Sequence, residues 1–458
     1  MFAIPGICAL IVFILARPQE FLPLFQKLPF LYIFCFMAIG GFVLDLKLRR
    51  LEPVAAPTLP WVAGFLLWGI ICDAVRVPAN LTQSVISLGI IFTLYATIAH
   101  GVQRFRTLHV VAGTVMVTCL YLSAVCFHQG LQPRSCVAAD EMHPGEGKPD
   151  GRSCEMALDC QGPDAEPGSE YRCEKVGLFG TYSIEDRVRY RGELHDPNEL
   201  SMTICVGGLA FLIAFAMQKR SGPWTVGAFV GGVLIVWTVI MSQSRGGLVV
   251  ALVVLGASFI KRYGWSGLVA AGLAGLPLMM LGGRSGESAD QSTFLRYEAW
   301  GAGLGMFKGS PIFGVGTRQF AEHFFMTAHN SYVLTLAETG MIGFYLFVAM
   351  LALSAKILWR GVVDLEHVPG ARVARIWGLA LLSSFFGLLF QIHTLSFAYH
   401  SVLWIYLGLA SAYWSAVRVH KPDFQVRLTP RDLALIGVGC VSYAFVVLPV
   451  FLKLKGAM

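Results

Sequence analysis

Charged residues are scarce in this 458-residue chain: Asp, Glu, Lys and Arg together make up 14% of it, whereas 55% is hydrophobic. Soluble domains carry about 25% charged residues, so most of this chain cannot face water. Its long apolar runs divide it into about twelve or thirteen membrane spans, each of about 20 residues. The sequence therefore predicts an all-α, polytopic transmembrane protein.

A concentrated basic surface is also absent. The net charge is +7, but the basic residues occur as short clusters between apolar runs. That distribution is typical of the loops that set the topology of a membrane protein. We therefore expect a lipid bilayer, and no nucleic acid, among the partners.

We expect no cleavable leader at the start of the chain. Residues 2–16 are apolar but lack a preceding basic region and a small-x-small cleavage site, and Arg17 follows them. We expect a retained span or a short re-entrant segment there. The expected spans are 2–16, 28–44, 60–77, 81–100, 107–127, 198–216, 224–242, 246–260, 265–281, 329–355, 373–391, 397–417 and 433–452.

Alternate connections between these spans collect 17 of the 35 Lys and Arg residues, whereas the opposite short connections and the C-terminal tail hold six. Because Lys and Arg are enriched in cytoplasmic loops, the first set is predicted to be cytoplasmic. Two long loops then lie on the outer face. The predicted organisation is helices over 1–127, an outer loop over 128–197, helices over 198–281, a second outer loop over 282–328 and helices over 329–458.

The chain has 11 cysteines but no C-x-x-C motif and no paired histidine spacing of the kind that zinc sites use. Seven cysteines lie in or beside apolar runs, where cysteine behaves as a small hydrophobic residue. The other four are in the first long loop: Cys136, Cys154, Cys160 and Cys173. An oxidising compartment favours two disulfides there, with three possible pairings, and a zinc site is the alternative.

The first long loop holds 14 of the 28 acidic residues, and we expect most of it to be a solvated, disulfide-stapled excursion. Near its end Arg187, Arg189 and Arg191 alternate, so their side chains would share one face of an extended segment. Three guanidiniums on one face suit a diphosphate, because Arg binds phosphate oxygens bidentately. The alternative is a surface strip that balances the acidic residues.

The sequence His-Asp-Pro-Asn-Glu at 195–199 leads directly into an apolar run. Asp196 is a suitable N-cap, Pro197 fits the first helical position and Glu199 the third, as in a capping box. Asn198 is then left at a helix N-terminus at the membrane surface, where anions are favoured.

Further along, Ser-Gln-Ser-Arg-Gly-Gly at 242–247 places Arg245 between two apolar runs on the expected outer face. An arginine at the membrane edge is costly unless it snorkels or finds a partner. Either its side chain snorkels to lipid headgroups or it faces a polar cavity, and we favour the cavity.

In the second outer loop, residues 293–307 are predicted to form an amphipathic helix along the membrane surface. Arg296, Trp300 and Leu304 would share one face because of their i, i+4, i+8 spacing. His329 and Asn330 then open the next long span. A histidine at this end of a helix is partly desolvated and near the positive end of the dipole, and both effects favour the neutral imidazole that a general base needs. An interfacial polar residue without a catalytic role is the alternative.

Together these segments resemble the bacterial O-antigen ligase and O-antigen polymerase superfamily, over roughly residues 185–350. The resemblance is carried by Pro-Asn-Glu-Leu at 197–200, Ser-Arg-Gly-Gly at 244–247, Arg296 with Trp300, Pro-Ile-Phe-Gly-Val-Gly at 311–316, and His329 and Asn330 followed by Gly-Met-Ile-Gly at 340–343. The last motif is the most specific, since its spacing is similar to the ligase signature. The cysteine-containing insert is not a general feature of that family.

The resemblance implies a multi-pass glycosyltransferase of the GT-C architecture in the bacterial inner membrane, with its active site facing the periplasm. The donor would be an undecaprenyl-diphosphate-linked glycan, and neither a metal nor a cofactor would be used. By the same resemblance, His329 would deprotonate the acceptor hydroxyl, while Arg245 and Arg296 would hold the diphosphate. Arg191 and Arg189 are further candidates for diphosphate binding, and supporting positions are expected for Asn198, Asn330 and Trp300.

The acceptor distinguishes the functions that remain. An O-antigen ligase transfers a finished glycan to lipid A-core, a polymerase joins repeat units, and a protein O-glycan ligase uses a protein; the His-Asn motif favours the first. A transporter or flippase belongs to a different class and would need ionisable residues deep within its spans. Such residues are scarce here, and the notable polar residues gather on one membrane face, which favours an enzyme.

Overall fold

The computed structural model is mostly helical, and it describes residues 1–139, 147–161, 171–219, 222–257 and 287–457, together with Gly264 and Ser266. The predicted span 265–281 has only Ser266 among the described residues, and the basic pair at 261–262 and the start of the second outer loop at 282–286 lie outside them. Each of the other expected spans corresponds to a helix.

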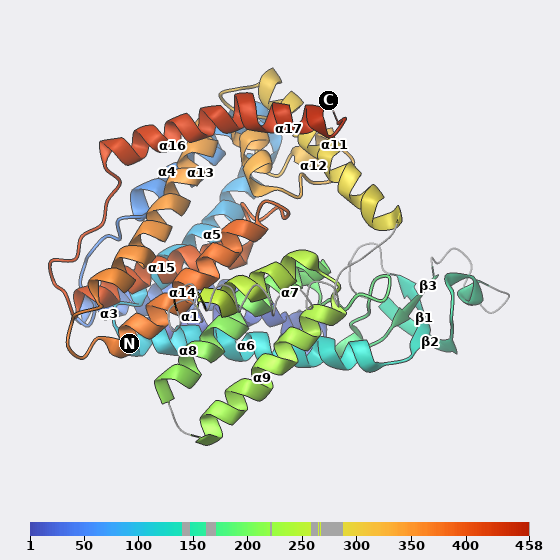
Figure 1. Cartoon of the computed structure of the whole chain (residues 1–458), viewed down its shortest axis with the longest axis horizontal. Coiled ribbons are helices and arrows are strands. Elements are labelled where there is room, and N and C mark those ends of the chain that lie inside the picture. Colours follow the sequence, from blue (N-terminus) through green and yellow to red (C-terminus); the bar gives the residue numbers. More distant parts are fainter. Residues whose placement is uncertain are drawn as a thin grey trace. The chain divides into compact units, whose positions relative to one another are not determined.

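Nine helical segments among the described residues are long and apolar enough to cross a membrane. They are Phe30–Lys47 (α3), Leu59–Arg76 (α4), Pro78–Gly101, Phe105–Leu131 (α6), Pro197–Lys219, Gly222–Met241 (α9), Ser331–Asp364 (α13), Arg372–Gln391 (α14) and Pro430–Leu454. Three of these segments join several elements: Pro78–Asn80 (η2) with Leu81–Gly101 (α5); Pro197–Ile204 (α7), Cys205–Leu209 (η6) and Ala210–Lys219 (α8); and Pro430–Ser442 (α16), Tyr443–Val447 (η7) and Leu448–Leu454 (α17). Other apolar helices include Ala3–Ala16 (α1), Arg245–Ala257 and Ser401–Arg418 (α15). The predicted all-α, polytopic fold is confirmed (Figure 1).

The connections contain further helical elements. The longest is Glu287–Gly309 (α11), which includes the helix predicted at 293–307. The others are Pro18–Glu20 (η1), Pro23–Gln26 (α2), Ala157–Cys160 (η3), Leu178–Gly180 (η4), Gly192–Leu194 (η5) and Phe320–His323 (α12).

Proline and capping residues explain where several spans begin. α4, α7 and α16 each have a proline in the first turn, where its missing N–H is not needed. α16 (Pro430–Ser442) also has a capping box in which Thr429 and Asp432 satisfy each other's backbone N–H groups. Pro449 later removes a helical hydrogen bond, and the π-helical turn η7 (Tyr443–Val447) lies directly before it. The span nevertheless continues from α16 into α17 in one direction (Figure 1).

The chain forms two compact units, and each is described by itself. The first contains Met1–Ile7, Phe34–Val110 and Ser285–Met458, and the second contains Cys8–Ile33 and Val111–Arg284. In the first unit α13 is the central helix, because α4, α11, α14, α15 and α16 all pack against it. Large buried side chains such as Phe65, Tyr95, Phe347 and Trp404 fill its interior.

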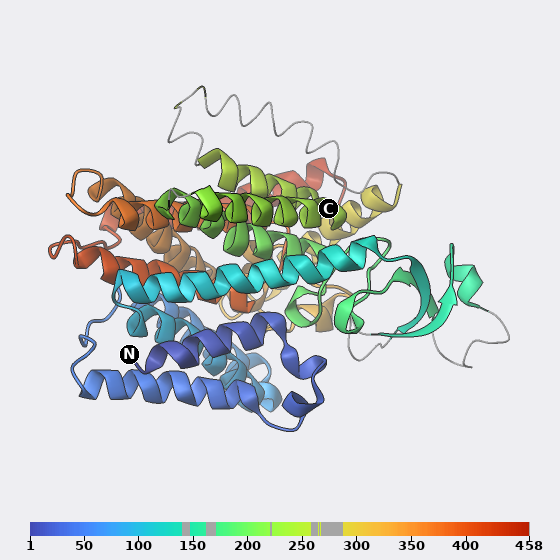
Figure 2. The same cartoon turned by 90° about the horizontal axis from the view of Figure 1, so that it is seen from below.

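The second unit contains α7, α8, α9, most of α6 and a small three-stranded sheet. The strands are Arg134–Ala139 (β1), Gly147–Ser153 (β2) and Tyr171–Lys175 (β3), and they pair antiparallel in the order β2-β1-β3. Figure 2 shows α6 leading almost directly into β1. The sequence did not predict this sheet, because β2 (Gly-Lys-Pro-Asp-Gly-Arg-Ser) has no hydrophobic alternation to mark it as a strand.

Two disulfides hold this sheet to its connections. Cys136 pairs with Cys160, and Cys154 pairs with Cys173. The expected pair of disulfides is therefore present in the first outer loop. The sulfur atoms that a zinc site would have used are engaged in these bonds.

Candidate active site

Asn198 connects three of the predicted segments within the second unit. Its Oδ1 atom accepts hydrogen bonds from Ser244 Oγ at 2.8 Å and from Arg187 Nη2 at 3.3 Å. Arg187 also donates from Nε to the carbonyl oxygen of Ser242 (3.0 Å). The amide at the start of α7 therefore links the arginine segment to the turn at 242–247.

Asp196 holds Asn198 in this position. As predicted, Asp196 is the N-cap of α7 and Pro197 occupies its first turn. Asp196 Oδ1 accepts from both the backbone N (2.7 Å) and the Nδ2 (2.8 Å) of Asn198. The second half of the expected capping box is not formed, since the hydrogen bonds of the described residues include none from the Asp196 N–H to the Glu199 carboxylate. Because Asn198 donates on one side and accepts on the other, the orientation of its amide is defined.

The Ser-Arg-Gly-Gly segment turns into the helix Arg245–Ala257. Ser244 Oγ accepts from the backbone N–H of Gly247 (3.1 Å), which is the N-cap arrangement. A Cβ atom on Gly247 would lie 2.3 Å from Ser201 Oγ, so α7 passes too close for a larger residue. Ser244 and Gly247 thus have structural roles, and Arg245 is the exposed charged residue of the motif.

Arg189 and Arg191 are buried, with 3% and 2% of their surface exposed. Arg189 donates from Nε to the Tyr182 carbonyl oxygen (3.1 Å), and its guanidinium lies 4.4 Å from the centre of the Tyr182 ring. Arg191 donates to the Phe179 carbonyl oxygen and lies 5.5 Å from the centre of the Phe21 ring. These two side chains therefore do not line an exposed face, and the surface-strip interpretation is wrong for them.

Burial also changes the electrostatics of this segment. Desolvation lowers the pKa of Arg189, and the neighbouring Tyr182 and Glu174 oppose that shift. Glu174 is itself buried and accepts hydrogen bonds from Ser183 Oγ and from the backbone N–H of Glu185. Positive charge is thus held inside the unit beside one acidic side chain.

His329 and Asn330 form the entry to α13 in the first unit. Asn330 is the N-cap, and its Oδ1 accepts from the backbone N–H groups of Tyr332 (3.0 Å) and Val333 (3.2 Å). His329 has φ +43°, in the left-handed region that non-glycine residues rarely adopt. Such conformations persist where the surrounding structure holds them, and they cluster at functional sites. The His329 side chain is half-buried and lies directly before the N-terminus of the 34-residue helix α13.

The connection between α14 and α15 supports the start of α13. The backbone N–H of Ser331 donates to the Ile392 carbonyl oxygen (2.8 Å), and Ser331 Oγ accepts from the Phe397 N–H (2.7 Å). Thr327 Oγ1, which accepts from the backbone N–H of His329 at 3.3 Å, lies 2.6 Å from Ser396 Oγ. Residues 392–397 thus contact the chain on both sides of His329, at Thr327 and Ser331.

The amphipathic helix expected at 293–307 lies within α11. Leu304 is buried and Phe294 is 43% exposed, so the helix has an inner and an outer side. Arg296 lies one turn before Trp300 and two turns before Leu304, on one face of the helix. Arg296 and His329 belong to the same unit.

Trp300 connects α11 to the histidine segment. Its Nε1 donates to the carbonyl oxygen of Ala328 (2.9 Å), the residue before His329. The Trp300 ring also packs against Tyr297 and Phe451, with ring centres 5.5 and 5.6 Å apart. The tryptophan that the motif pairs with Arg296 therefore holds the backbone next to the histidine.

The two glycine motifs of the first unit interlock. α13 is interrupted at Gly340, which has φ +66°. The segment 311–316 lies in the break and forms hydrogen bonds with it. These run from Val315 N to Ala337 O (3.0 Å), from Gly316 N to Glu338 O (3.0 Å) and from Met341 N to Pro311 O (2.8 Å). A broken membrane helix is tolerated when neighbouring groups satisfy its freed backbone in this way.

Only glycine fits at the two points of closest approach. A Cβ atom on Gly340 would lie 2.2 Å from the Ile312 carbonyl oxygen, and one on Gly314 would lie 2.3 Å from the Glu338 carbonyl carbon. Both residues also have positive φ. The glycines of the two motifs are thus explained by one backbone crossing.

Two buried carboxylates, which the sequence pattern did not single out, hold the residues that follow this crossing. Asp73 accepts from the backbone N and the Oγ1 of Thr317, both at 2.5 Å. Glu338 Oε1 accepts from the backbone N–H of Phe320 (3.0 Å). Each carboxylate is 1% exposed. An acidic residue inside an apolar run is the signal that would have found them.

Tyr399 lies beside this pair. Burial and the neighbouring charges of Glu338 and Asp73 raise the pKa of Tyr399 well above its ordinary value. Its hydroxyl therefore stays protonated. Arg318, which has φ +59°, lies with its guanidinium 5.8 Å from the centre of the Tyr399 ring.

The geometry thus gathers the expected residues into two groups, each within its own unit. Asn198 and the Arg245 turn are joined in the second unit, with Arg189 and Arg191 buried in the same unit. His329, Asn330, Trp300 and Arg296 belong to the first unit.

A comparison with protein families matches a segment that contains residues from both groups. Residues 230–348 match the family model described as O-antigen ligase. Over these residues the chain is similar to O-antigen ligases. The resemblance to the O-antigen ligase and polymerase superfamily is thereby confirmed. A search of curated proteins finds no match to this chain.

The segment matched by the O-antigen ligase model contains most of the candidate residues. Arg245, Arg296, Trp300, His329 and Asn330 all lie within 230–348. The matched segment also includes the interlocked glycine segments. The arginines at 187–191, Asn198 and the disulfide-bonded insert precede it.

Proposed function

We propose that this protein is an O-antigen ligase, which moves a glycan from undecaprenyl diphosphate to a hydroxyl of lipid A-core on the periplasmic face of the inner membrane. The match to the O-antigen ligase model supports a ligase- or polymerase-type activity on a lipid-linked glycan. The observation that carries the proposal is the position of His329 in the matched segment, at the capped N-terminus of α13.

His329 acts as the general base. It takes the proton of the acceptor hydroxyl as that oxygen attacks the anomeric carbon of the donor sugar. The bond between that carbon and the diphosphate oxygen breaks, and the electron pair leaves with the diphosphate. Because the attack comes from the side opposite the leaving group, the anomeric configuration inverts. A positioned base contributes about 10²–10⁴ in rate, and the scheme uses no metal or cofactor.

Arg245 and Arg296 bind the diphosphate. Its negative charge grows as the bond breaks, so guanidiniums already in place stabilise the transition state more than the bound substrate. The contacts of Ser244 with Asn198 and of Gly247 with α7 support a defined position for Arg245. Arg191 and Arg189 contribute positive potential from their buried positions.

The family match favours this enzyme over a transporter. Asp73 and Glu338 are ionisable residues within apolar helices, but both accept hydrogen bonds from loop backbone, which accounts for their burial. A polymerase or a protein O-glycan ligase would use the same donor and the same residues, so the product distinguishes these activities.

The test is complementation of a strain that lacks the native gene. We expect His329→Ala and Arg296→Ala to abolish surface glycan on gels while the protein remains in the membrane. Loss of lipid A-linked chains indicates a ligase, whereas chains of a single repeat indicate a polymerase. Loss of glycan from a protein indicates a protein O-glycan ligase.

His323→Ala is the matched control. His323 is exposed on α12, its Nδ1 lies 3.0 Å from the Gln319 carbonyl oxygen, and it is outside the proposed machinery. This variant should produce normal glycan. Normal glycan from both His329→Ala and Arg296→Ala would overturn the catalytic assignment.

A further inference from the structure

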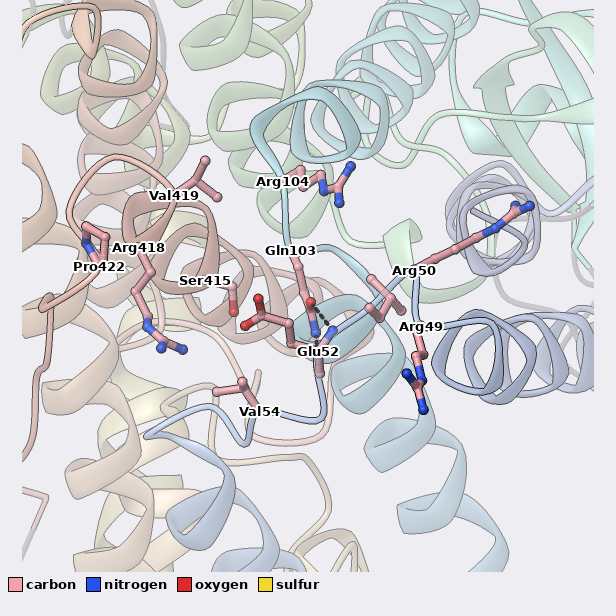
Figure 3. A pocket seen from close by; sticks show the side chains of 11 residues that line it. Arg49, Arg50, Glu52, Val54, Gln103, Arg104, Ser415, Arg418, Val419 and Pro422 are labelled. Atoms are coloured by element: carbon pink, nitrogen blue, oxygen red, sulfur yellow. Dashed lines mark hydrogen bonds between the residues drawn. The ribbon is translucent and has the colours of Figure 1, made fainter.

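A basic pocket lies in the first unit where three connections meet. Its volume is about 380 Å³, within the range of ligand sites. Four arginines and one acidic residue are among its lining residues: Arg49, Arg50, Arg104, Arg418 and Glu52. Figure 3 shows the arginines distributed around Glu52, Gln103 and Ser415.

The pocket is at the far end of α15 from the candidate active site. α15 begins at Ser401, just after Phe397 contacts the start of α13, and it ends at Arg418. Its 18 residues rise about 27 Å at 1.5 Å each, close to the thickness of the bilayer core of about 30 Å. The pocket therefore lies at the opposite membrane boundary from His329, where the basic connections predict the cytoplasmic face.

Glu52 offsets only part of the positive charge of this pocket. Among the described residues, no salt bridge involves any of the four arginines. Arg50 lies 4.9 Å from the centre of the Phe2 ring, and Arg418 lies 4.9 Å from the centre of the Trp414 ring. An aromatic face holds a guanidinium in place and leaves its N–H edges available for an anion.

The backbone around the pocket is fixed by hydrogen bonds. The Gln103 side chain accepts from the Glu52 N–H (2.9 Å) and donates to the Glu52 carbonyl oxygen (2.8 Å), which joins the α3–α4 connection to the end of α5 (Figure 3). Arg49 has φ +54°, and the Arg50 N–H donates to the Asp45 carbonyl oxygen (2.9 Å), which terminates α3. The backbone that carries the arginines is thus held in place by hydrogen bonds, which reduces the conformational entropy lost when a ligand binds.

We propose that this pocket binds a phosphate group, supplied by the headgroup of a membrane phospholipid or by a soluble phosphate compound. Guanidiniums bind phosphate oxygens bidentately, and the lining residues include four arginines and one glutamate. Leu51, Val54 and Val419 add apolar surface beside them. The position at the ends of membrane helices, where basic pockets bind anionic headgroups, favours the phospholipid.

The test uses the purified full-length protein in detergent, with native mass spectrometry to follow binding of phosphatidylglycerol. We expect Arg104→Gln and Arg418→Gln each to weaken binding about tenfold, since each removes charged hydrogen-bond donors. Glu52→Gln should bind more tightly, because it removes the acidic group of the lining while leaving the backbone clamp to Gln103 intact. A gain in affinity cannot arise from misfolding.

Arg431→Gln is the matched control, because Arg431 is an exposed arginine in the first turn of α16 and does not line the pocket. It should bind phosphatidylglycerol like the wild type. Displacement of the lipid by excess inorganic phosphate identifies a soluble phosphate as a ligand, and resistance to displacement identifies the headgroup. The proposal is overturned if the pocket variants bind the lipid and inorganic phosphate like the wild type, or if Arg431→Gln weakens binding equally.

Discussion

Ser244 donates its hydroxyl hydrogen to Asn198 across 46 residues of sequence, at an oxygen–oxygen distance of 2.8 Å. The same hydroxyl accepts from the backbone N–H of Gly247, so it both starts the helix that carries Arg245 and ties that start to α7. Asn198 lies outside the O-antigen ligase match at 230–348. The position of Arg245 therefore depends on a residue that precedes the matched domain.

Ser244→Ala should impair glycan transfer at least tenfold, because Arg245 loses its connection to Asn198 and small errors in position are costly in catalysis. Loss of the N-cap should also lower the free energy of unfolding by about 1 kcal/mol. Ser244→Thr keeps the hydroxyl and is the control. Transfer rates measured with purified protein check this expectation, and wild-type activity in Ser244→Ala would contradict it.

Trp300→Phe removes the indole N–H that donates to Ala328 while keeping an aromatic ring. We expect kcat to fall about tenfold with little change in KM, because the neighbouring His329 would be less well positioned. Trp359→Phe is the control, since Trp359 is 56% exposed. A higher KM at unchanged kcat would instead place Trp300 in substrate binding.

Gly340→Ala should destabilise the first unit, since the new Cβ would meet the Ile312 carbonyl oxygen and positive φ costs about 1–3 kcal/mol for other residues. The measurement is the temperature at which half of the detergent-solubilised protein ceases to be monodisperse. Gly439→Ala is the control, because nothing lies within 4 Å of the added atom on α16. If this temperature is the same for Gly340→Ala as for the wild type, the segment 311–316 can move away from α13 to make room for the added atom, and the expectation is wrong.

Asp73→Ala removes the acceptor for the backbone and hydroxyl of Thr317. Each charge-assisted hydrogen bond is worth about 1.5–3 kcal/mol, so the segment 317–320 should become accessible to protease and the midpoint should fall. Asp73→Asn keeps one carbonyl acceptor, and its effect should be smaller. Equal protease resistance in wild type and Asp73→Ala would rule out this role.

Replacing Cys136 and Cys160 together by Ser opens one of the two disulfides. Such a bond contributes about 2–4 kcal/mol, so the insert should be cleaved faster in limited proteolysis. Glycan transfer should persist, because the proposed machinery lies elsewhere. Cys8→Ala, at a free cysteine, is the control and should leave the cleavage rate unchanged.

Prediction from sequence succeeded where neighbours in the chain determine a residue's role. Asp196 and Pro197 start α7 because capping uses groups only two residues apart. It did not show that Arg189 and Arg191 are buried, since alternation places side chains on one face but does not say whether that face is exposed. It also missed β2, which has no hydrophobic pattern.

The amino-acid sequence by itself determined the polytopic helical fold, the places of the family motifs and the confinement of four cysteines to one loop, because these follow from local hydrophobicity and spacing. Only the tertiary structure decided the disulfide pairing, the contact of Asn198 with Ser244 and the crossing at Gly340. Asp73 and Thr317, 244 residues apart, show the physical reason most clearly. A buried carboxylate must find donors, but which donors reach it depends on how distant helices pack.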